Sequence, residues 1–211
     1  MWNASGHRWH VSRRPVADLL LFGFTLAELA LLVKLTPTFS FVDWVYLLQH
    51  VAVLVIALIR WPATARDFSP LAYAACSVGL AYPYGQVIWL RFAAGYEAWP
   101  GIGDVLVTLA AFLSLAGLLA LGRRFGIRPA LRGVVTGGPY LLVRHPIYLS
   151  YLIADVGYNL QEWNAGTLLL TLMGWGSLLY RIRAEESVLA QDPRWADYVA
   201  RVRYRLLPGV W

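Results

Sequence analysis

The sequence has few charged residues and almost no cysteine, and both shortages limit what the protein can be. Charged side chains make up 14% of the 211 residues, against 59% hydrophobic ones, whereas a soluble domain carries about 25% charged residues. The lone cysteine, Cys76, excludes a disulfide within one chain and any cysteine-based metal cluster. The composition is therefore that of a membrane protein.

Sequence patterns that mark common classes of enzyme are also missing. The chain has no GxGxxG before a helix, no P-loop, no HExxH and no GxSxG. Its four histidines lie in different segments and form no set of metal ligands. We therefore expect no bound metal. The net charge of +6 could suggest a nucleic-acid partner, but in a membrane protein the basic residues mark the cytoplasmic loops, so we expect no such partner.

The sequence instead contains long runs of apolar residues. A helix needs about 20 apolar residues to cross a bilayer, and the runs come close to this length. They predict an all-α, polytopic integral membrane protein with five to six transmembrane helices. The runs are 16–35, 42–60, 70–92, 104–121, 146–160 and 164–181.

The last two runs are short and are joined only by the letters QEWN at 161–164, which predicts a C-terminal helical hairpin. A charged helix is expected to follow over about 182–203. The Asp192-Pro193 pair should break or restart it, because proline does not continue a helix.

The basic residues indicate an orientation. If the N-terminus lies inside and six helices cross the membrane, all of the 18 basic residues except Lys34 and Arg91 fall on one side. Basic residues mark cytoplasmic loops. We therefore expect both termini and the segment 122–145 in the cytoplasm, without removal of an N-terminal signal peptide.

Several polar side chains interrupt the apolar runs. Such residues are costly in lipid and are often functional, but they can equally be structural pairs between helices. They are Asp18, Glu28, His50, Gln86 and Asp155.

The stretch GGPYLLVRHPIYLSYL at 137–152 opens the fifth run with polar residues. Pro146 suits the first position of a helix, so His145 lies near its N-cap. Tyr148 is three residues from His145 and four from Arg144, which allows them to share a face. The free N–H groups of the helix could then help to hold an anionic or very polar small molecule. Arginine and tyrosine anchors at a membrane surface are an equally good interpretation.

The stretch YRIRAEESVL at 180–189 forms a second polar cluster where the last run ends. Arg181 and Glu185 are four residues apart, and Arg183 and Glu186 are three apart, so both pairs could be ordinary ion pairs within one helix. The expected topology, however, places this cluster on the same side of the membrane as His145.

Together these stretches carry a resemblance over roughly residues 120–211. RGVVTGGPYLLVRHPIYLSYL, then RIRAEESVL, and finally RYRLLPGVW resemble the isoprenylcysteine carboxyl methyltransferase family, and the related phospholipid methyltransferases share the pattern. The resemblance implies one membrane domain over 1–211. Residues 1–121 would supply transmembrane helices, and residues 122–211 would form the catalytic, cofactor-binding part.

The family binds S-adenosylmethionine on the cytoplasmic side, between the hairpin and the C-terminal helix. By resemblance the acceptor's polar group would meet Arg183 or, as second choice, Arg181, and these two would be the catalytic residues. One of the two adjacent glutamates would bind the cofactor. The matching cofactor-binding positions are Val134, Val135, Tyr140, His145, Pro146, Ile147, Tyr148, Glu185 and Glu186.

Two departures from the family pattern concern specificity. Ser150 stands where the family often has glycine, and QDPRWADY replaces the usual Phe-Gly element of the C-terminal helix. The second departure weakens any transfer of specificity for prenylcysteine. The acceptor is therefore expected to be a prenylcysteine-like carboxylate or another lipophilic or lipid molecule that enters from the bilayer.

Two other functions stay open at this point. One is an NADPH-dependent membrane reductase of sterol-like lipids, a group with a similar R-H-P stretch that commonly has asparagine where this chain has Ile147. The other is a non-enzymatic membrane scaffold. In each case we expect an integral protein of a membrane such as the bacterial inner membrane, surrounded by membrane lipids.

Overall fold

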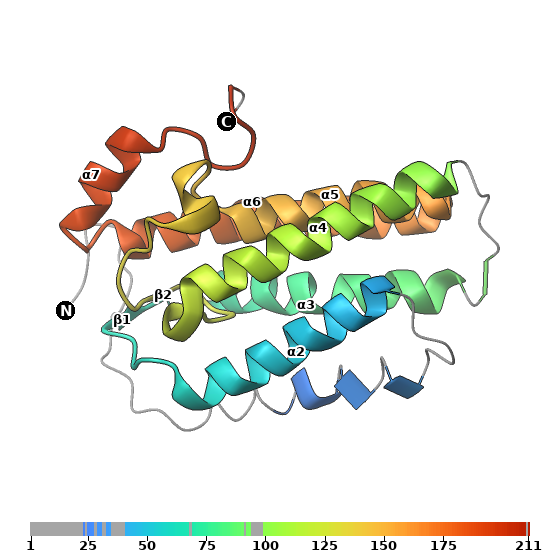
Figure 1. Ribbon diagram of the computed structural model, residues 1–211, viewed down its shortest axis with the longest axis horizontal. Helices are drawn as coiled ribbons and strands as arrows, with labels where there is room; N and C mark the ends of the chain where they lie inside the picture. The colour runs from blue at the N-terminus through green and yellow to red at the C-terminus, as the bar shows by residue number, and fades with distance from the viewer. Residues whose placement is uncertain are drawn as a thin grey trace.

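Five long helices lie along one another in the structure, which is a computed structural model (Figure 1). It describes residues 23, 25–27, 29–30, 33–34, 41–67, 69–90, 92–93, 99–209 and 211. The long helices are α2 (Phe41–Ile59), α3 (Pro70–Leu90), α4 (Pro100–Leu121), α5 (Pro146–Gln161) and α6 (Ala165–Leu189). They correspond to the second to sixth apolar runs, but α6 continues without a break to Leu189, so the first part of the charged helix expected over about 182–203 belongs to α6. Most of the first run, including Asp18 and Glu28, lies outside the described residues.

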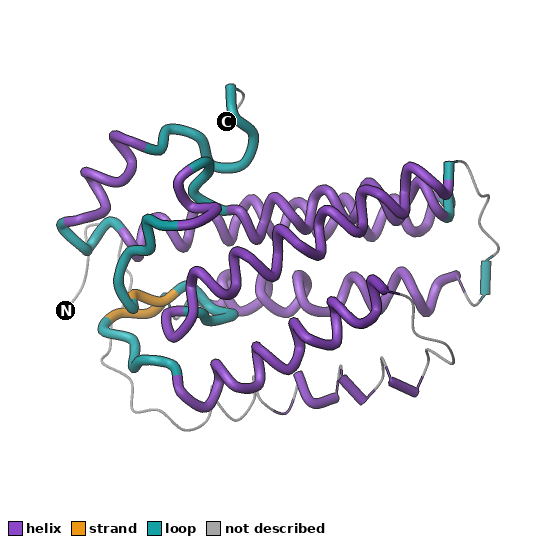
Figure 2. The backbone as a smooth tube through the Cα atoms, in the orientation of Figure 1, coloured by secondary structure: helices purple, strands orange, loops and turns teal. Residues whose placement is uncertain are grey.

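The short elements gather at one end of the helices (Figure 2). They are β1 (Ala65–Arg66), η1 (Gly122–Arg124), β2 (Ala130–Leu131), η2 (Gly138–Leu141) and α7 (Arg194–Arg201). The two strands pair antiparallel, with Ala65 opposite Leu131 and Arg66 opposite Ala130. No pattern in the sequence predicted this pairing, which ties the α2–α3 loop to the α4–α5 loop. The expectation of an all-helical chain is correct apart from these two short strands.

Proline and asparagine set the helix starts. Pro70, Pro100 and Pro146 each occupy the first residue of a helix, where no backbone N–H is needed. Asn164 caps α6, because its side chain accepts a hydrogen bond from the backbone N–H of Gly166. The expected break at Asp192-Pro193 is confirmed, since α6 ends at Leu189 and α7 begins at Arg194.

Glycines allow the helices to pack closely. A Cβ atom added to Gly103 of α4 would lie 2.7 Å from the carbonyl oxygen of Gly157 in α5. On the other side of the bundle, a Cβ at Gly174 of α6 would lie 2.8 Å from the ring of Tyr82 in α3. Small residues at contacts of this kind let transmembrane helices approach one another. α5 therefore packs mainly on α4, and α6 mainly on α3, although a short turn joins α5 to α6.

Buried polar side chains link the same helices. The carboxylate of Asp155 accepts hydrogen bonds from the Tyr82 hydroxyl at 3.0 Å and from the Trp175 indole at 2.9 Å. The Gln86 amide donates to the Thr171 hydroxyl at 2.6 Å. Two of the polar residues that interrupt the apolar runs thus have partners on neighbouring helices, as buried polar groups require.

The outer surface of the bundle is apolar. Leu58, Leu109, Leu119 and Leu169 are each more than half exposed, and a large exposed apolar surface marks contact with a membrane or partner. Among the described residues, Pro100–Arg124 is the helix long and apolar enough to cross a membrane by length and composition, and Asp43–Ile59 is a shorter apolar helix. The expected number of five to six spans stays a prediction.

Candidate functional site

The N-terminus of α5 is held by the C-terminal segment. The backbone N–H groups of Arg144 and His145 donate to the carbonyl oxygens of Tyr204 and Arg205, both at 2.9 Å. Arg205 in turn lies over the ring of Trp211, with its guanidinium carbon 5.0 Å from the ring centroid. The segment after α7 therefore supplies hydrogen-bond acceptors at the residue where α5 begins.

Glu186 joins the three segments that meet at this point. One carboxylate oxygen lies 2.9 Å from Arg144 and 3.3 Å from the His145 ring, and the other lies 2.8 Å from Arg205. Burial alone would raise the pKa of Glu186, but hydrogen bonds from His145 and Arg205 and the nearby positive charges outweigh it, so its pKa lies below the usual value. Glu186 thus ties the start of α5 to the C-terminal segment, and its expected contact with the cofactor stays a prediction.

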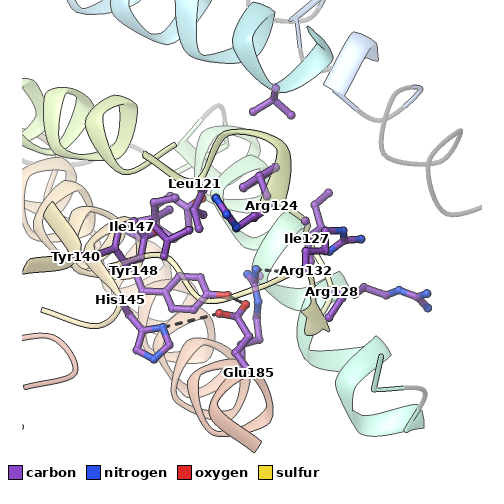
Figure 3. Close-up of a pocket in the computed structure, with 18 of the residues that line it drawn as sticks. Leu121, Arg124, Ile127, Arg128, Arg132, Tyr140, His145, Ile147, Tyr148 and Glu185 are labelled. Carbon is purple, nitrogen blue, oxygen red and sulfur yellow. Dashed lines mark hydrogen bonds and ion pairs between the residues drawn. The ribbon is translucent and has the colours of Figure 1, made fainter. Parts of the chain in front are cut away.

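Glu185 faces the opposite way, toward a cavity (Figure 3). The Tyr148 hydroxyl donates a short hydrogen bond to its carboxylate, and the His145 ring lies 3.8 Å from the other carboxylate oxygen. The rings of His145 and Tyr148 are stacked, with centroids 5.6 Å apart. The buried guanidinium of Arg181 covers the Tyr148 ring at 5.0 Å.

An aromatic and apolar wall closes the same side. The Tyr198 hydroxyl donates to the carbonyl oxygen of Tyr140 at 2.8 Å, which fixes α7 against η2. Trp195 and Val134 complete a buried cluster with these two tyrosines. Burial raises the pKa of both Tyr140 and Tyr198 above the usual value, so both phenols are neutral and act through hydrogen bonds and ring faces.

The cavity enclosed by these walls has a volume of about 350 Å³ and extends between α2 and α3. This is the size of a small-molecule site. Five arginines line it and Glu185 is its acidic residue among those described. The arginines are Arg124, Arg128, Arg132, Arg144 and Arg181.

Positive charge is concentrated around this lining. The Nε atoms of Arg124, Arg144 and Arg181 are buried without a hydrogen-bond partner among the described residues. Burial, followed by the charges of neighbouring arginines, lowers the pKa of Arg132 to about 9. An anionic group in the cavity would be attracted by this concentration of positive charge.

The structure brings most of the expected site residues together. The expected residues that line the cavity are Val134, Val135, Tyr140, His145, Ile147, Tyr148, Glu185 and Arg181. Pro146 is buried at the start of α5 and, like Glu186, is outside the lining. The suggested ion pair of Arg183 with Glu186 is absent from the described contacts, because Glu186 pairs with Arg144 and Arg205.

The two candidate acceptor residues lie in different surroundings. Arg183 is exposed and lies outside the cavity lining, whereas Arg181 is buried and lines the cavity. Residues two positions apart on a helix project their side chains about 200° apart around the axis, so these two cannot share one face. Their roles toward an acceptor stay predictions.

Sequence reasoning missed Arg205, Trp195 and Tyr198. A signal for two of them exists in QDPRWADY, since Trp195 and Tyr198 are three residues apart and share one face of α7. It also missed Arg124 and Arg128. Of the described residues, no group of three or more His, Cys, Asp or Glu could hold a metal ion.

Comparison with known proteins agrees with the resemblance in the sequence. Residues 104–191 match the family model of the isoprenylcysteine carboxyl methyltransferase (ICMT) family, which confirms that resemblance over this part of the chain. No curated protein gives a significant match. A solved structure of the eukaryotic intramembrane Ras methyltransferase ICMT is similar, with 19% identity and a TM-score of 0.48, over 95% of this chain and 88% of the other.

Proposed function

Since residues 104–191 match the isoprenylcysteine carboxyl methyltransferase family, we propose that this protein is a membrane methyltransferase that uses S-adenosylmethionine to methylate a lipophilic acceptor. The observation that carries the proposal is the cavity in which His145, Tyr148 and Glu185 meet Arg181. These residues belong to the two stretches on which the resemblance rests.

The residues present fit the cofactor. When bound, S-adenosylmethionine supplies an electrophilic methyl group on a positively charged sulfur. Glu185 and the face of Tyr148 are groups that attract such a cation. The positive charge of lining arginines such as Arg124 and Arg132 suits its carboxylate, and the wall of Tyr140 and Trp195 suits its flat base.

Positioning is the main task of the chain in this reaction. Methyl transfer is an in-line displacement that depends on the alignment of two reactants. Arg181, held by its hydrogen bond to the Ile127 carbonyl at 3.2 Å, is suited to bind an acceptor carboxylate, which is already nucleophilic. For an amine acceptor, Glu185 is the group that would take the proton.

The acceptor is expected to reach the cavity from the bilayer. Residues of α2 and α3 line part of the cavity, and the outer faces of these helices carry exposed apolar side chains such as Leu58 and Ile88. The cofactor is polar and its proposed ligands lie at the end of the bundle where the arginines gather. A lipophilic acceptor and a water-soluble cofactor would thus approach the same cavity from different directions.

Calorimetric titration with S-adenosylhomocysteine tests the proposal. The purified protein in detergent should bind it, and His145→Ala and Glu185→Gln should weaken binding by about tenfold to a hundredfold, as loss of charge-assisted hydrogen bonds does. Glu162→Gln, an exposed glutamate at the α5–α6 turn, is the matched control and should bind as the wild type does. Absence of binding, or binding of NADPH instead, would overturn the assignment.

A further inference from the structure

The C-terminal segment, which follows α7, lies against the side of the helical bundle. Its Leu206 is buried in one cluster with Leu178 and Ile182 of α6. Leu178 belongs to the apolar run 164–181, so the segment reaches the level at which the apolar outer surface of α6 begins. Figure 1 shows the C-terminus beside α6 rather than beyond the end of the bundle.

The short helix η2 lies at the corresponding level of α4. A Cβ atom added to Gly138 of η2 would lie 3.4 Å from the Cβ of Ala120, near the end of α4. Shortly after η2, the backbone N–H of Arg144 donates to the carbonyl oxygen of Tyr204 at 2.9 Å, and the Arg144 side chain donates to that of Arg203 at 3.0 Å. The end of η2 and the C-terminal segment are therefore neighbours.

Both parts expose large apolar side chains. Leu141 and Leu142 of η2 are 66% and 71% exposed, and Leu207 of the C-terminal segment is 47% exposed. Leu119 of α4 and Leu179 of α6 are exposed as well, so the apolar outer surface of these two helices continues onto η2 and the segment. An extended apolar surface of this kind marks contact with a membrane or a partner.

Positive charge accompanies these apolar side chains. Residues 198–211 contain Arg201, Arg203 and Arg205 but neither aspartate nor glutamate. Arg205 is paired with Glu186 at 2.8 Å, whereas Arg201 and Arg203 are exposed. Exposed arginines beside exposed leucines match the layered structure of a membrane surface, in which anionic headgroups lie above acyl chains.

We propose that η2, the end of α7 and the C-terminal segment together form a surface that binds anionic lipids. Arg201 and Arg203 contact the phosphate groups of the lipids. Leu142 and Leu207 enter the boundary between headgroups and acyl chains. The proposal does not depend on the identity of the methyl acceptor. It places lipid headgroups beside the proposed cofactor site, because carbonyl oxygens of the same segment hold the start of α5.

A first experiment measures whether this surface touches lipid. Leu142→Cys or Leu207→Cys is introduced into Cys76→Ser protein, labelled with the fluorophore NBD and reconstituted into vesicles of phosphatidylcholine and phosphatidylglycerol. The vesicles contain a lipid with a nitroxide near the top of its acyl chain. Both labels should be quenched clearly more than a label at Gln191→Cys, an exposed position between α6 and α7. Quenching no greater than at Gln191, for either label, would overturn the proposal.

A second experiment measures the preference for negative charge. The label at Leu142→Cys is quenched by nitroxide-labelled phosphatidylglycerol or by phosphatidylcholine with the same nitroxide, each added in small amounts to phosphatidylcholine vesicles. Phosphatidylglycerol should give half of the maximal quenching at about a fivefold lower fraction, because basic side chains near the membrane attract anionic lipids. High salt should reduce this difference, since it screens exposed charges. Equal quenching by the two lipids at low salt would overturn the proposal.

Variants show whether the arginines carry the preference. Arg201→Gln combined with Arg203→Gln should bring the two lipids to nearly equal quenching, whereas lysine at both positions keeps the charge and should keep the preference. Arg194→Gln is the matched control, because Arg194 is an exposed arginine at the other end of α7 that already pairs with Asp192 at 2.6 Å. An unchanged preference in the double glutamine variant, or its loss in the double lysine variant, would contradict the proposed contact with lipid phosphates.

Discussion

At the scale of single residues, substitutions of Arg181 and Arg183 are expected to affect turnover differently, although only two positions separate these residues. Arg181 is buried over Tyr148, and Arg183 is exposed. Arg181→Lys keeps the charge but removes the planar group that stacks on the ring, so we expect turnover to fall about tenfold or more. Arg183→Lys should stay within about twofold of the wild type.

Methylation rates of the purified variants, measured at saturating cofactor, check this expectation. A larger loss in Arg183→Lys than in Arg181→Lys would restore the order suggested by the sequence and contradict the geometry of the cavity. The titration with S-adenosylhomocysteine serves as the folding control, since both proteins should still bind it.

Glu186 makes stability depend on pH. Its folded-state pKa lies below the usual value of about 4.3. A carboxyl whose pKa is lowered by folding stabilises the fold above its unfolded pKa, and this contribution is lost as pH falls through the folded-state pKa. Glu186→Gln should therefore lower the melting temperature clearly at pH 7.

Thermal unfolding of the wild type and Glu186→Gln at pH 7, 5, 4 and 3 measures this effect. The gap between the two melting temperatures should narrow below about pH 4, as the carboxylate of the wild type is protonated. Glu162→Gln, at the exposed turn, should show no comparable gap. A gap of constant size across the series would mean that Glu186 acts through packing alone.

At the scale of elements, the crossing of α4 and α5 depends on the absence of a side chain at Gly103. A Cβ at that position would lie 2.6 Å from Gln161 and 2.7 Å from the Gly157 carbonyl, whereas a Cβ at Gly101 meets nothing within 4 Å. Gly103→Ala should therefore destabilise the protein by about 1–3 kcal/mol, as overpacking does.

Gly101→Ala provides the matched control in the same helix. Alanine is the better helix former, so this change should be neutral or stabilising by up to about 1 kcal/mol. Unfolding of both variants in detergent decides the matter. Equal stability of the two would show that α4 and α5 separate easily at this end.

The C-terminal segment is an element in its own right, because it holds the start of α5. Arg205 links it to Glu186, with side-chain contacts at 2.8 and 2.9 Å. Arg205→Ala should weaken binding of S-adenosylhomocysteine by about tenfold, since His145 would lose part of its support. Arg203→Ala is the control, because Arg203 is exposed and contributes its backbone carbonyl to Arg144.

Binding by Arg205→Ala at wild-type affinity would contradict this role of the segment. The same variant should also lose thermal stability, and its helical content, measured by circular dichroism, should stay close to that of the wild type. This combination distinguishes a local loosening of the site from loss of the fold.

At the scale of the whole molecule, the charge distribution predicts which end faces the cytoplasm. Among the described residues, the arginines of 122–145 and 181–205 lie at the end of the bundle that carries β1, β2 and α7 (Figure 1). The α5–α6 turn lies at the other end, where Gln161 donates to Asp104 at 2.6 Å. Basic residues stay on the cytoplasmic side.

Cysteine labelling tests this orientation in a Cys76→Ser background. A cysteine placed at Glu162 should react with a membrane-impermeant thiol reagent from outside the cell, and one placed at Arg201 should react only after the membrane is opened. Labelling of both positions from the same side would contradict the expected topology.

The division of the chain at residue 121 stays a prediction, and residues from both parts line the cavity.

The sequence by itself determined where along the chain the helices lie, although α6 continues past its apolar run to Leu189. Helix starts and ends depend on local signals in the sequence. Here these signals are the apolar runs, the proline at the first residue of α3, α4 and α5, and the Asp192-Pro193 pair after α6. The two stretches around His145 and Glu185 could also be found, because their residue types and spacing are visible in one dimension.

Only the tertiary structure decided how these stretches are used. Whether Arg181 or Arg183 faces inward depends on which side of α6 packs against α3, although the line of Gly174, Ser177 and Arg181 on the buried face was a usable hint. The pairing of Glu186 with Arg205, the β1–β2 contact and the lining of the cavity each join segments far apart in the chain. Such contacts arise from the packing of whole helices, which no local spacing specifies.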